Sequence, residues 1–186
     1  MPLPPPRAAP PRLHGWTLIE TMVTLLVLAL LCAVALPDVR ALLDRQRAAS
    51  ARHLLSTDLA FARLSALQRH EEVSVCASAD GRHCTDVDSW GHGWIVYVAG
   101  PRATTPAAAG DILRQQRWQR WQRPAGWRIV SSAGRGRLRY LRDGRAYGTN
   151  LSLRICRDDR LLGRVVVNNS GRVRSEVHDA PGGCPR

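Results

Sequence analysis

The sequence predicts an α+β fold in which one long N-terminal transmembrane helix packs on a globular head of antiparallel β-strands. Three observations predict it: an apolar run near the N-terminus, a helical spacing of apolar residues after that run, and a change to two-residue alternation in the rest of the chain. The 186 residues leave room for a single domain of this kind.

The apolar run extends over residues 16–36 and contains one charged residue, Glu20. At 1.5 Å per residue a helix of this length spans roughly 30 Å, the thickness of a hydrocarbon core. Residues 1–15 before it are rich in proline and carry Arg7 and Arg12 but no acid, as expected on a cytoplasmic flank. An ordinary signal anchor is the simpler alternative. However, an unpaired carboxylate such as Glu20 within the lipid costs a few kcal/mol of insertion free energy, and an ordinary signal anchor does not explain its presence.

Residues 37–70 continue the helical pattern outside the membrane, so we expect one helix from Trp16 to about Arg69. Pro37 predicts a kink or a turn in this helix. An apolar stripe with spacings of three and four residues should cover the head, with charged residues off the stripe. The stripe consists of Leu55, Leu59, Ala62 and Ala66, and the charged residues off it are Arg52, Asp58, Arg63 and Arg69.

Residues 71–186 should form the β-rich head. Turn signals such as Asp80-Gly81, Asp143-Gly144 and Asn168–Gly171 separate short alternating segments, and residues 101–110 indicate a loop. About seven strands are expected. They lie within Val73–Ser78, Trp94–Val98, Trp127–Ser131, Leu138–Leu141, Leu151–Cys156, Arg164–Val167 and Arg172–Val177.

The head contains four of the five cysteines, and the fifth, Cys32, lies in the apolar helix as a small hydrophobic residue. An even number of cysteines in an oxidising compartment favours disulfides. Three pairings are possible, and we expect Cys76–Cys84 and Cys156–Cys184. The alternative is a metal site built from Cys76, His83, Cys84 and His92, but this spacing matches no usual zinc pattern. We therefore expect neither metal nor cofactor.

The charge balance favours an acidic partner. All 27 basic residues are arginine, against 15 acidic residues, and the net charge is +12. Arginine holds phosphate through a planar fork of donors, although a GC-rich coding bias would also favour arginine. The sequence contains no Ser/His/Asp arrangement, phosphate-binding glycine loop or zinc-protease motif, so an enzyme is not expected.

Gly15-Trp16-Thr17-Leu18-Ile19-Glu20 resembles the type IV prepilin signature. The resemblance implies that prepilin peptidase cleaves after Gly15 and methylates the new N-terminus at Trp16. The usual residue at that position is phenylalanine, another large aromatic. Glu20 would then pair with the N-terminal amine of a neighbouring subunit during assembly, and this pairing explains a carboxylate in an apolar helix.

The head resembles the GspH/FimT family of minor pilins and pseudopilins. The resemblance implies either a secretion pseudopilin or a FimT-type subunit of a type IV pilus, and some members of the pilus branch bind DNA in natural transformation through Gly-Arg-x-Arg. Gly171, Arg172 and Arg174 match that motif. The other segments that carry the resemblance are Leu59–Ala66, Val75–Ser78, Trp90–Tyr97, Arg142–Arg145 and Ser170–Arg174.

Physical chemistry gives this motif a plausible role. Arg172 and Arg174 would point to one face of a strand, and Gly171 would complete a turn that a phosphate can approach. Glu176, on the same face, is the alternative partner of the two arginines. Other groups would enlarge the basic patch: Arg135, Arg137, Arg139, Arg154, and the segment Arg114–Arg128 with Trp118, Trp121 and Trp127, whose composition suits single strands.

The sequence as a whole predicts a FimT-like minor pilin that binds DNA non-specifically in DNA uptake and takes part in pilus assembly. The expected partners are other major and minor pilin subunits, prepilin peptidase, DNA and, before assembly, inner-membrane lipid. The head should lie in the periplasm of a bacterium, on a single-pass protein of the inner membrane that enters a pilus or pseudopilus. The alternative is a minor pseudopilin of the type II secretion system with a purely structural role.

Overall fold

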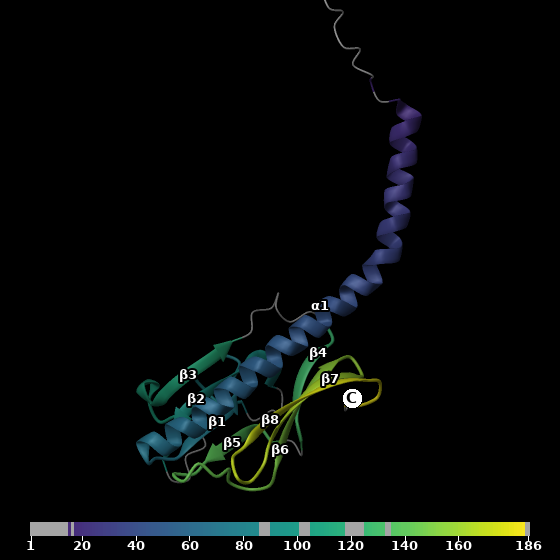
Figure 1. Ribbon diagram of the computed structural model, residues 1–186. Helices are drawn as coiled ribbons and strands as arrows, with labels where there is room; N and C mark the ends of the chain where they lie inside the picture. The colour runs from purple at the N-terminus through teal and green to yellow at the C-terminus, as the bar shows by residue number, and fades with distance from the viewer. Residues whose placement is uncertain are drawn as a thin grey trace, which may run out of the picture. The chain divides into compact units, whose positions relative to one another are not determined.

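The structure, a computed structural model, describes residue 15 and residues 17–85, 90–100, 105–117, 125–132 and 135–184. These residues form one α-helix, two 3₁₀ turns and eight strands (Figure 1). They are α1 (Leu18–Arg69), η1 (Trp90–His92), η2 (Ala109–Asp111), β1 (Val73–Ala77), β2 (Gly93–Val98), β3 (Ile112–Arg117), β4 (Trp127–Ser131), β5 (Arg137–Tyr140), β6 (Leu151–Arg157), β7 (Arg160–Val167) and β8 (Val173–Ala180).

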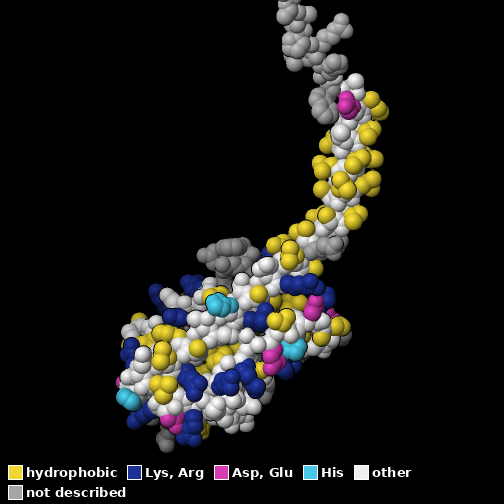
Figure 2. Space-filling model, in the orientation of Figure 1, with side chains coloured by type: hydrophobic (Ala, Val, Ile, Leu, Met, Phe, Trp, Pro, Cys, Tyr) yellow, Lys and Arg dark blue, Asp and Glu magenta, His cyan; other side chains and the backbone are white. Residues whose placement is uncertain are grey.

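The chain divides into two compact units, residues 1–42 and residues 43–186. In the first unit, the large apolar side chains of α1 from Leu18 to Leu36 are exposed, and Figure 2 shows this stretch covered by apolar groups. By length and composition, α1 is able to cross a membrane. The helix includes Pro37, so the proline does not open a turn there.

The second unit contains the head, and two four-stranded antiparallel sheets form it together with α1 from residue 43. The strand order is β3-β2-β1-β5 in the first sheet and β4-β6-β7-β8 in the second. This arrangement confirms the α+β fold with an antiparallel head. The strand β3 was not expected, because its residues Ile112-Leu113-Arg114-Gln115-Gln116-Arg117 do not alternate in polarity and the strand lies at a sheet edge.

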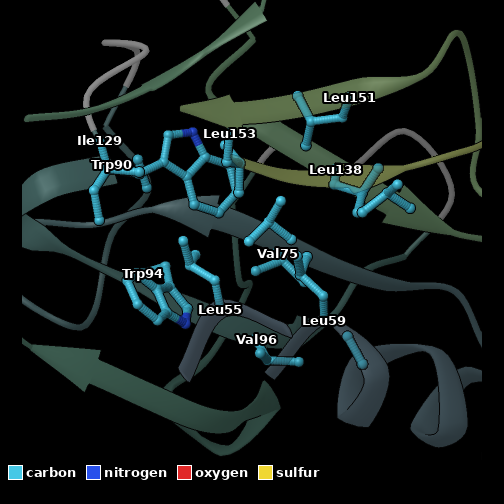
Figure 3. Close-up of a cluster of buried hydrophobic side chains, with 14 of the residues drawn as sticks. Leu55, Leu59, Val75, Trp90, Trp94, Val96, Ile129, Leu138, Leu151 and Leu153 are labelled. Carbon is cyan, nitrogen blue, oxygen red and sulfur yellow. The ribbon is translucent and has the colours of Figure 1, made fainter. Parts of the chain in front are cut away.

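The apolar stripe of α1 lies in the core, as expected. Leu55, Leu59, Ala62 and Ala66 are each at most 1% exposed. Figure 3 shows the two leucines among side chains from both sheets and from η1, including Trp90. Since a fully buried leucine stabilises a fold by roughly 1.5–3 kcal/mol, this stripe holds the two sheets to the helix.

Asp58 was expected off the stripe and is instead buried, with 4% of its surface exposed. Its carboxylate accepts a hydrogen bond from Trp94 Nε1 at 2.8 Å and one from Arg114 Nη1 at 2.9 Å. The Arg114 guanidinium also lies 3.9 Å from the centre of the Phe61 ring. A buried indole N–H needs an acceptor, and the carboxylate on α1 supplies it.

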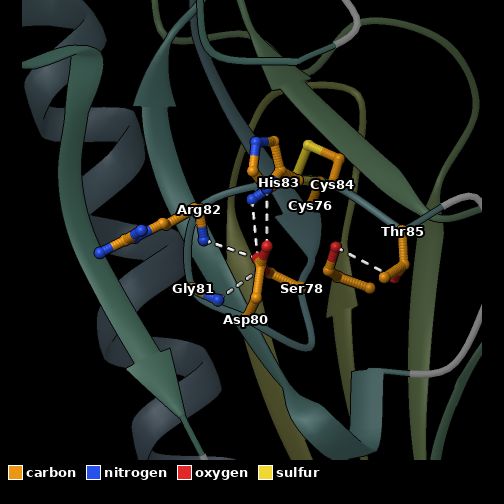
Figure 4. Close-up of a disulfide and its surroundings, with 9 residues drawn as sticks. Cys76, Ser78, Asp80, Gly81, Arg82, His83, Cys84 and Thr85 are labelled. Carbon is orange, nitrogen blue, oxygen red and sulfur yellow. Dashed lines mark hydrogen bonds and ion pairs between the residues drawn. A yellow bond between two sulfur atoms is a disulfide. The ribbon is translucent and has the colours of Figure 1, made fainter. Parts of the chain in front are cut away.

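The first disulfide joins Cys76 of β1 to Cys84, with 5.6 Å between the Cα atoms. It closes a turn organised by Asp80, which accepts bonds from the ring and backbone nitrogens of His83 and from the backbone of Arg82 (Figure 4). These bonds, that from the His83 ring above all, hold the pKa of Asp80 far below its usual value. Because the two sulfurs are bonded to each other, the alternative metal site with His83 and His92 is wrong.

The second disulfide joins Cys156 of β6 to Cys184, which follows β8. Both cysteines are buried with Leu161 and the partly buried Val130. The C-terminal tail is thereby fixed over one end of the second sheet. Both pairs are those expected from the sequence, and Cys32 remains a free thiol on α1.

Candidate nucleic-acid interface

A tight turn between β7 and β8 positions the arginines of the Gly-Arg-x-Arg motif. The side-chain oxygen of Asn168 accepts hydrogen bonds from the backbone N–H of Arg172 at 2.9 Å and from the hydroxyl of Ser170 at 2.8 Å. The backbone of Gly171 donates to the carbonyl of Asn168 at 2.9 Å. Asn and Ser commonly organise turns in this way, so the direction in which β8 begins is set locally.

Gly171 completes the turn, as the sequence predicts, and also permits the close packing behind it. It is buried and has φ +77°, a conformation that glycine adopts without strain. A Cβ there would lie 2.0 Å from the carbonyl oxygen of Gly144. That same carbonyl accepts a bond from Arg63 Nε of α1 at 3.0 Å. Gly171 therefore lets two loops and the helix meet.

Arg172 and Arg174 are both exposed, at the start of the edge strand β8. Arg174 pairs in register with Val166, whereas the buried Val165 and Val167 on either side of Val166 face the core. Arg174 therefore points away from the core. Neither arginine side chain forms an ion pair or hydrogen bond with another described residue.

Glu176, the alternative partner of these arginines, is held by other residues. Arg164 of β7 lies opposite it and donates through Nε at 3.0 Å, and His178 Nε2 lies at 3.2 Å. The pKa of Glu176 is lowered, mainly by the hydrogen bond from Arg164 and to a smaller extent by the hydrogen bond from His178. Within the described part of the chain, the charges of Arg172 and Arg174 are thus uncompensated.

Arg154 extends this basic surface across the second sheet. It lies opposite Arg164 in the β6–β7 pairing, on the side of the sheet that faces away from the buried Leu153 and Ile155. Arg154, Arg164 and Arg174, with the carboxylate of Glu176 among them, therefore share this side of β6, β7 and β8, and Arg172 lies directly before β8. We call Arg154, Arg164, Arg172 and Arg174 the arginine face.

The expected arginines in β5 and just before it have partners within the protein, and β5 belongs to the other sheet. Arg139 forms an ion pair with Glu72 at 3.4 Å, and its guanidinium lies 4.1 Å from the centre of the Tyr147 ring. Arg135 donates to the carbonyl of Thr149 at 2.7 Å, and Arg137 also interacts within the protein. These three are less available to an external anion than the arginine face.

The arginine- and tryptophan-rich segment divides among several roles. Trp127 is buried and donates to Asp44 at 3.4 Å, so a stacking role for it is wrong. Arg114 is bound to Asp58, as described above, and Arg128 donates to the carbonyl of Asp158 at 2.9 Å. Trp118 and Trp121 lie outside the described residues.

At the other end of the chain, Gly15 and Glu20 are exposed, and Trp16 lies outside the described residues. The hydroxyl of Thr17 accepts a hydrogen bond from the backbone of Glu20 at 3.3 Å, an arrangement typical of a helix start. Glu20 lies in the first turn of α1, where the helix dipole favours a negative charge.

One exposed aromatic residue, Tyr147, lies near the motif and was not expected from the sequence. Tyr147 lies in the loop between β5 and β6 and is 60% exposed. The Asp143-Gly144 pair marks the loop in the sequence, but no sequence signal shows that this ring faces solvent.

Comparison with known proteins gives a consistent result. The family model described as "Type II transport protein GspH" matches residues 51–171. The crystal structure of the type IV minor pilin FimU of Pseudomonas aeruginosa PAO1 gives a TM-score of 0.56 at 21% identity, over 71% of this chain and 90% of that one. A second crystal form of FimU gives 0.53 at 19% identity, over 68% and 90%.

The minor pseudopilin EpsH of the type 2 secretion system of Vibrio cholerae gives a TM-score of 0.47 at 14% identity, over 70% of this chain and 97% of that one. No curated protein sequence matches the chain. The likeness to FimU shows the fold. The family match ends at Gly171, directly before Arg172.

Proposed function

Because the chain belongs to the GspH family of type II transport proteins, and is thus a minor pilin or pseudopilin, we propose that it is a FimT-like subunit of a type IV pilus that binds DNA. Binding occurs without sequence preference, in DNA uptake, through Arg172 and Arg174. The observation that carries the proposal is that both arginines are exposed and that neither guanidinium is paired with another residue that the structure describes, while Glu176 on the same strand face is held by Arg164.

The N-terminal residues support the assembly role. Prepilin peptidase cleaves between Gly15 and Trp16 and methylates Trp16, and inner-membrane lipid surrounds the exposed apolar part of α1 before assembly. In the fibre, other major and minor pilins replace the lipid, and Glu20 pairs with the N-terminal amine of a neighbour. The head lies in the periplasm, and its role is binding and assembly, not catalysis.

The arginine face suits a phosphate backbone. Guanidinium and phosphate form short, charge-assisted bonds, often in pairs. Such contacts measure charge and spacing and do not depend on the base. Arg174 and Arg172 stand at the open edge of the sheet, and Arg154 continues the positive charge inward. A strand of DNA lying across β8 would therefore meet several cations in succession.

Fluorescence anisotropy over a salt series tests the proposal, with the membrane-extracted chain in non-ionic detergent. Replacing both Arg172 and Arg174 by alanine should weaken binding to duplex DNA and flatten the log–log salt slope by about two units, because each phosphate contact adds about −0.9. The fold should stay intact, because both side chains are exposed.

The matched control replaces Arg82 and Arg117, two exposed arginines outside the arginine face. This variant loses the same charge and should keep the salt slope within about half a unit. Equal losses in both double variants would show that only net charge matters. Unchanged binding in the Arg172/Arg174 variant would contradict the proposed site.

The second candidate function is a minor pseudopilin of the type II secretion system that acts only through subunit contacts. The description of the matching family favours it. A wild-type chain that binds no DNA at low salt would favour this function over DNA binding.

A further inference from the structure

We propose that Tyr147 is a stacking platform for an unpaired base, so that the head prefers single-stranded DNA to duplex. This inference rests on the proposed DNA binding and specifies the form of DNA. The platform borders an open hollow of about 400 Å³, which we call the Tyr147 hollow. Its lining includes Leu141, Arg145, Ala146, Tyr147, Asn169 and Ser170.

Tyr147 differs from the other aromatic residues that the structure describes. Trp90, Trp94, Trp127, Tyr97 and Tyr140 are buried, and Phe61 is partly buried under Arg114. Tyr147 is 60% exposed. Its ring therefore contributes little to the core and remains accessible to a ligand.

The ring is held in place although it is exposed. The backbone of Tyr147 donates to the carbonyl of Arg139 at 2.8 Å, and the preceding Ala146 bridges to Tyr140. The Arg139 guanidinium lies against the ring, 4.1 Å from its centre, and is itself paired with Glu72. A base that stacks on Tyr147 thus adds to an existing cation–aromatic pair. Because the ring is already held in place, binding immobilises few additional side chains and costs little conformational entropy.

The hollow is connected to the arginine motif through the backbone. Ala146 donates to the carbonyl of Asn169 at 3.1 Å, and Gly171 packs against Gly144. Asn169 and Ser170 line the hollow, and Arg172 follows two residues later. A nucleotide with its base in the hollow can therefore place a phosphate toward Arg172.

The lining has the chemistry of a nucleotide site. Tyr147 offers an aromatic face, Asn169 and Ser170 offer polar groups to base edges, and Arg145 adds charge, shared with Asp143 through a contact of 2.6 Å. Arg142, at the same loop, is exposed. Bases in a duplex are already stacked on each other, so only an unpaired base can use the ring.

The test compares Tyr147→Ala and Tyr147→Phe with the wild-type full chain in non-ionic detergent. Each is titrated with a short oligothymidylate, an abasic strand of the same length and a duplex of the same length. Stacking on one aromatic side chain is worth about 1–3 kcal/mol per base, so Tyr147→Ala should weaken oligothymidylate binding about 5- to 150-fold. Tyr147→Phe should retain the affinity.

Duplex and abasic strand should bind Tyr147→Ala within about twofold of wild type, with an unchanged salt slope, because phosphate contacts remain. Equal losses on all three ligands would overturn the platform and assign Tyr147 to positioning Arg139. Unchanged binding of all three ligands would also overturn the stacking proposal, and a protein partner would then be the expected occupant of the Tyr147 hollow. In either case binding by the wild-type chain would uphold the proposed function, whereas no binding of any DNA would refute both.

Discussion

Replacing Asp58 by alanine should destabilise the head more than any substitution of an exposed charge. The carboxylate is 4% exposed and accepts bonds from Trp94 Nε1 at 2.8 Å and Arg114 Nη1 at 2.9 Å. Alanine removes both acceptor oxygens. Trp94 is 1% exposed, so its indole N–H would lose this partner in a site that water does not reach.

The two lost bonds differ in magnitude. A buried donor that loses its acceptor costs about 1–3 kcal/mol. The Arg114 side chain is 40% exposed and can turn to water, so its ion pair adds at most about 1 kcal/mol. A total of roughly 2–3 kcal/mol should lower the melting temperature by about 4–12 °C for a chain of this size.

Thermal unfolding in non-ionic detergent, followed by near-UV circular dichroism of the tryptophans, measures this change. Asp58→Asn is the matched control, since its amide oxygen still accepts from Trp94 while the negative charge is lost. It should cost about 1 kcal/mol or less. The reasoning is refuted if alanine shifts the transition by no more than about 1 °C, or if asparagine is as damaging as alanine.

Three further predictions concern the termini and turns. In cells with active prepilin peptidase, mass spectrometry of the purified protein should find an N-methylated Trp16 at the N-terminus. The Gly15→Ala variant should keep residues 1–15. An intact Met1 terminus on the wild-type chain would contradict the pilin assignment. Non-reducing peptide mapping should recover Cys76–Cys84 and Cys156–Cys184, and reduction should lower the melting temperature, since one closed loop stabilises by about 2–4 kcal/mol. Asp80→Asn should destabilise the chain at neutral pH, and the difference from wild type should shrink as the pH falls below about 4, because the folded-state pKa of Asp80 lies below its unfolded value; a difference that persists in acid would refute this.

Local patterns were sufficient to predict the helix and most strands. The spacing of Leu55, Leu59, Ala62 and Ala66 specifies one helix face, and all four residues are buried. The strand β3 was missed because none of its residues is fully buried, so no buried face imposes an alternation of apolar and polar residues on its sequence. Asp58 was misplaced because its burial depends on an indole 36 positions away along the chain.

The candidate site was predictable in its motif but not in its charge balance. Whether Glu176 neutralises Arg174 or Arg164 depends on the β7–β8 register, which follows from the exact geometry of the turn between the strands; the sequence marks that turn at Asn168–Gly171 but does not give its geometry. The sequence likewise does not show that Gly171 meets Gly144, because the two belong to different loops. Long-range pairing therefore decides which arginines remain available.

Each disulfide joins a strand to a segment outside the sheets, Cys76 of β1 to Cys84 and Cys156 of β6 to Cys184, and neither joins the two sheets to each other or to α1. When tension enters the head through α1, as in a fibre under load, no disulfide fixes the helix to the sheets, and apart from the chain link to β1 it is noncovalent packing that resists displacement of the helix. After that packing fails, the two chain segments between the bonded cysteines, which span 8 and 28 residues, remain closed by their disulfides. At about 3.4 Å per residue, the disulfides prevent roughly 120 Å of the chain from being pulled out into an extended conformation. The head should therefore yield by sliding of the helix, while its sheet ends remain tethered and ready to refold when the load is released.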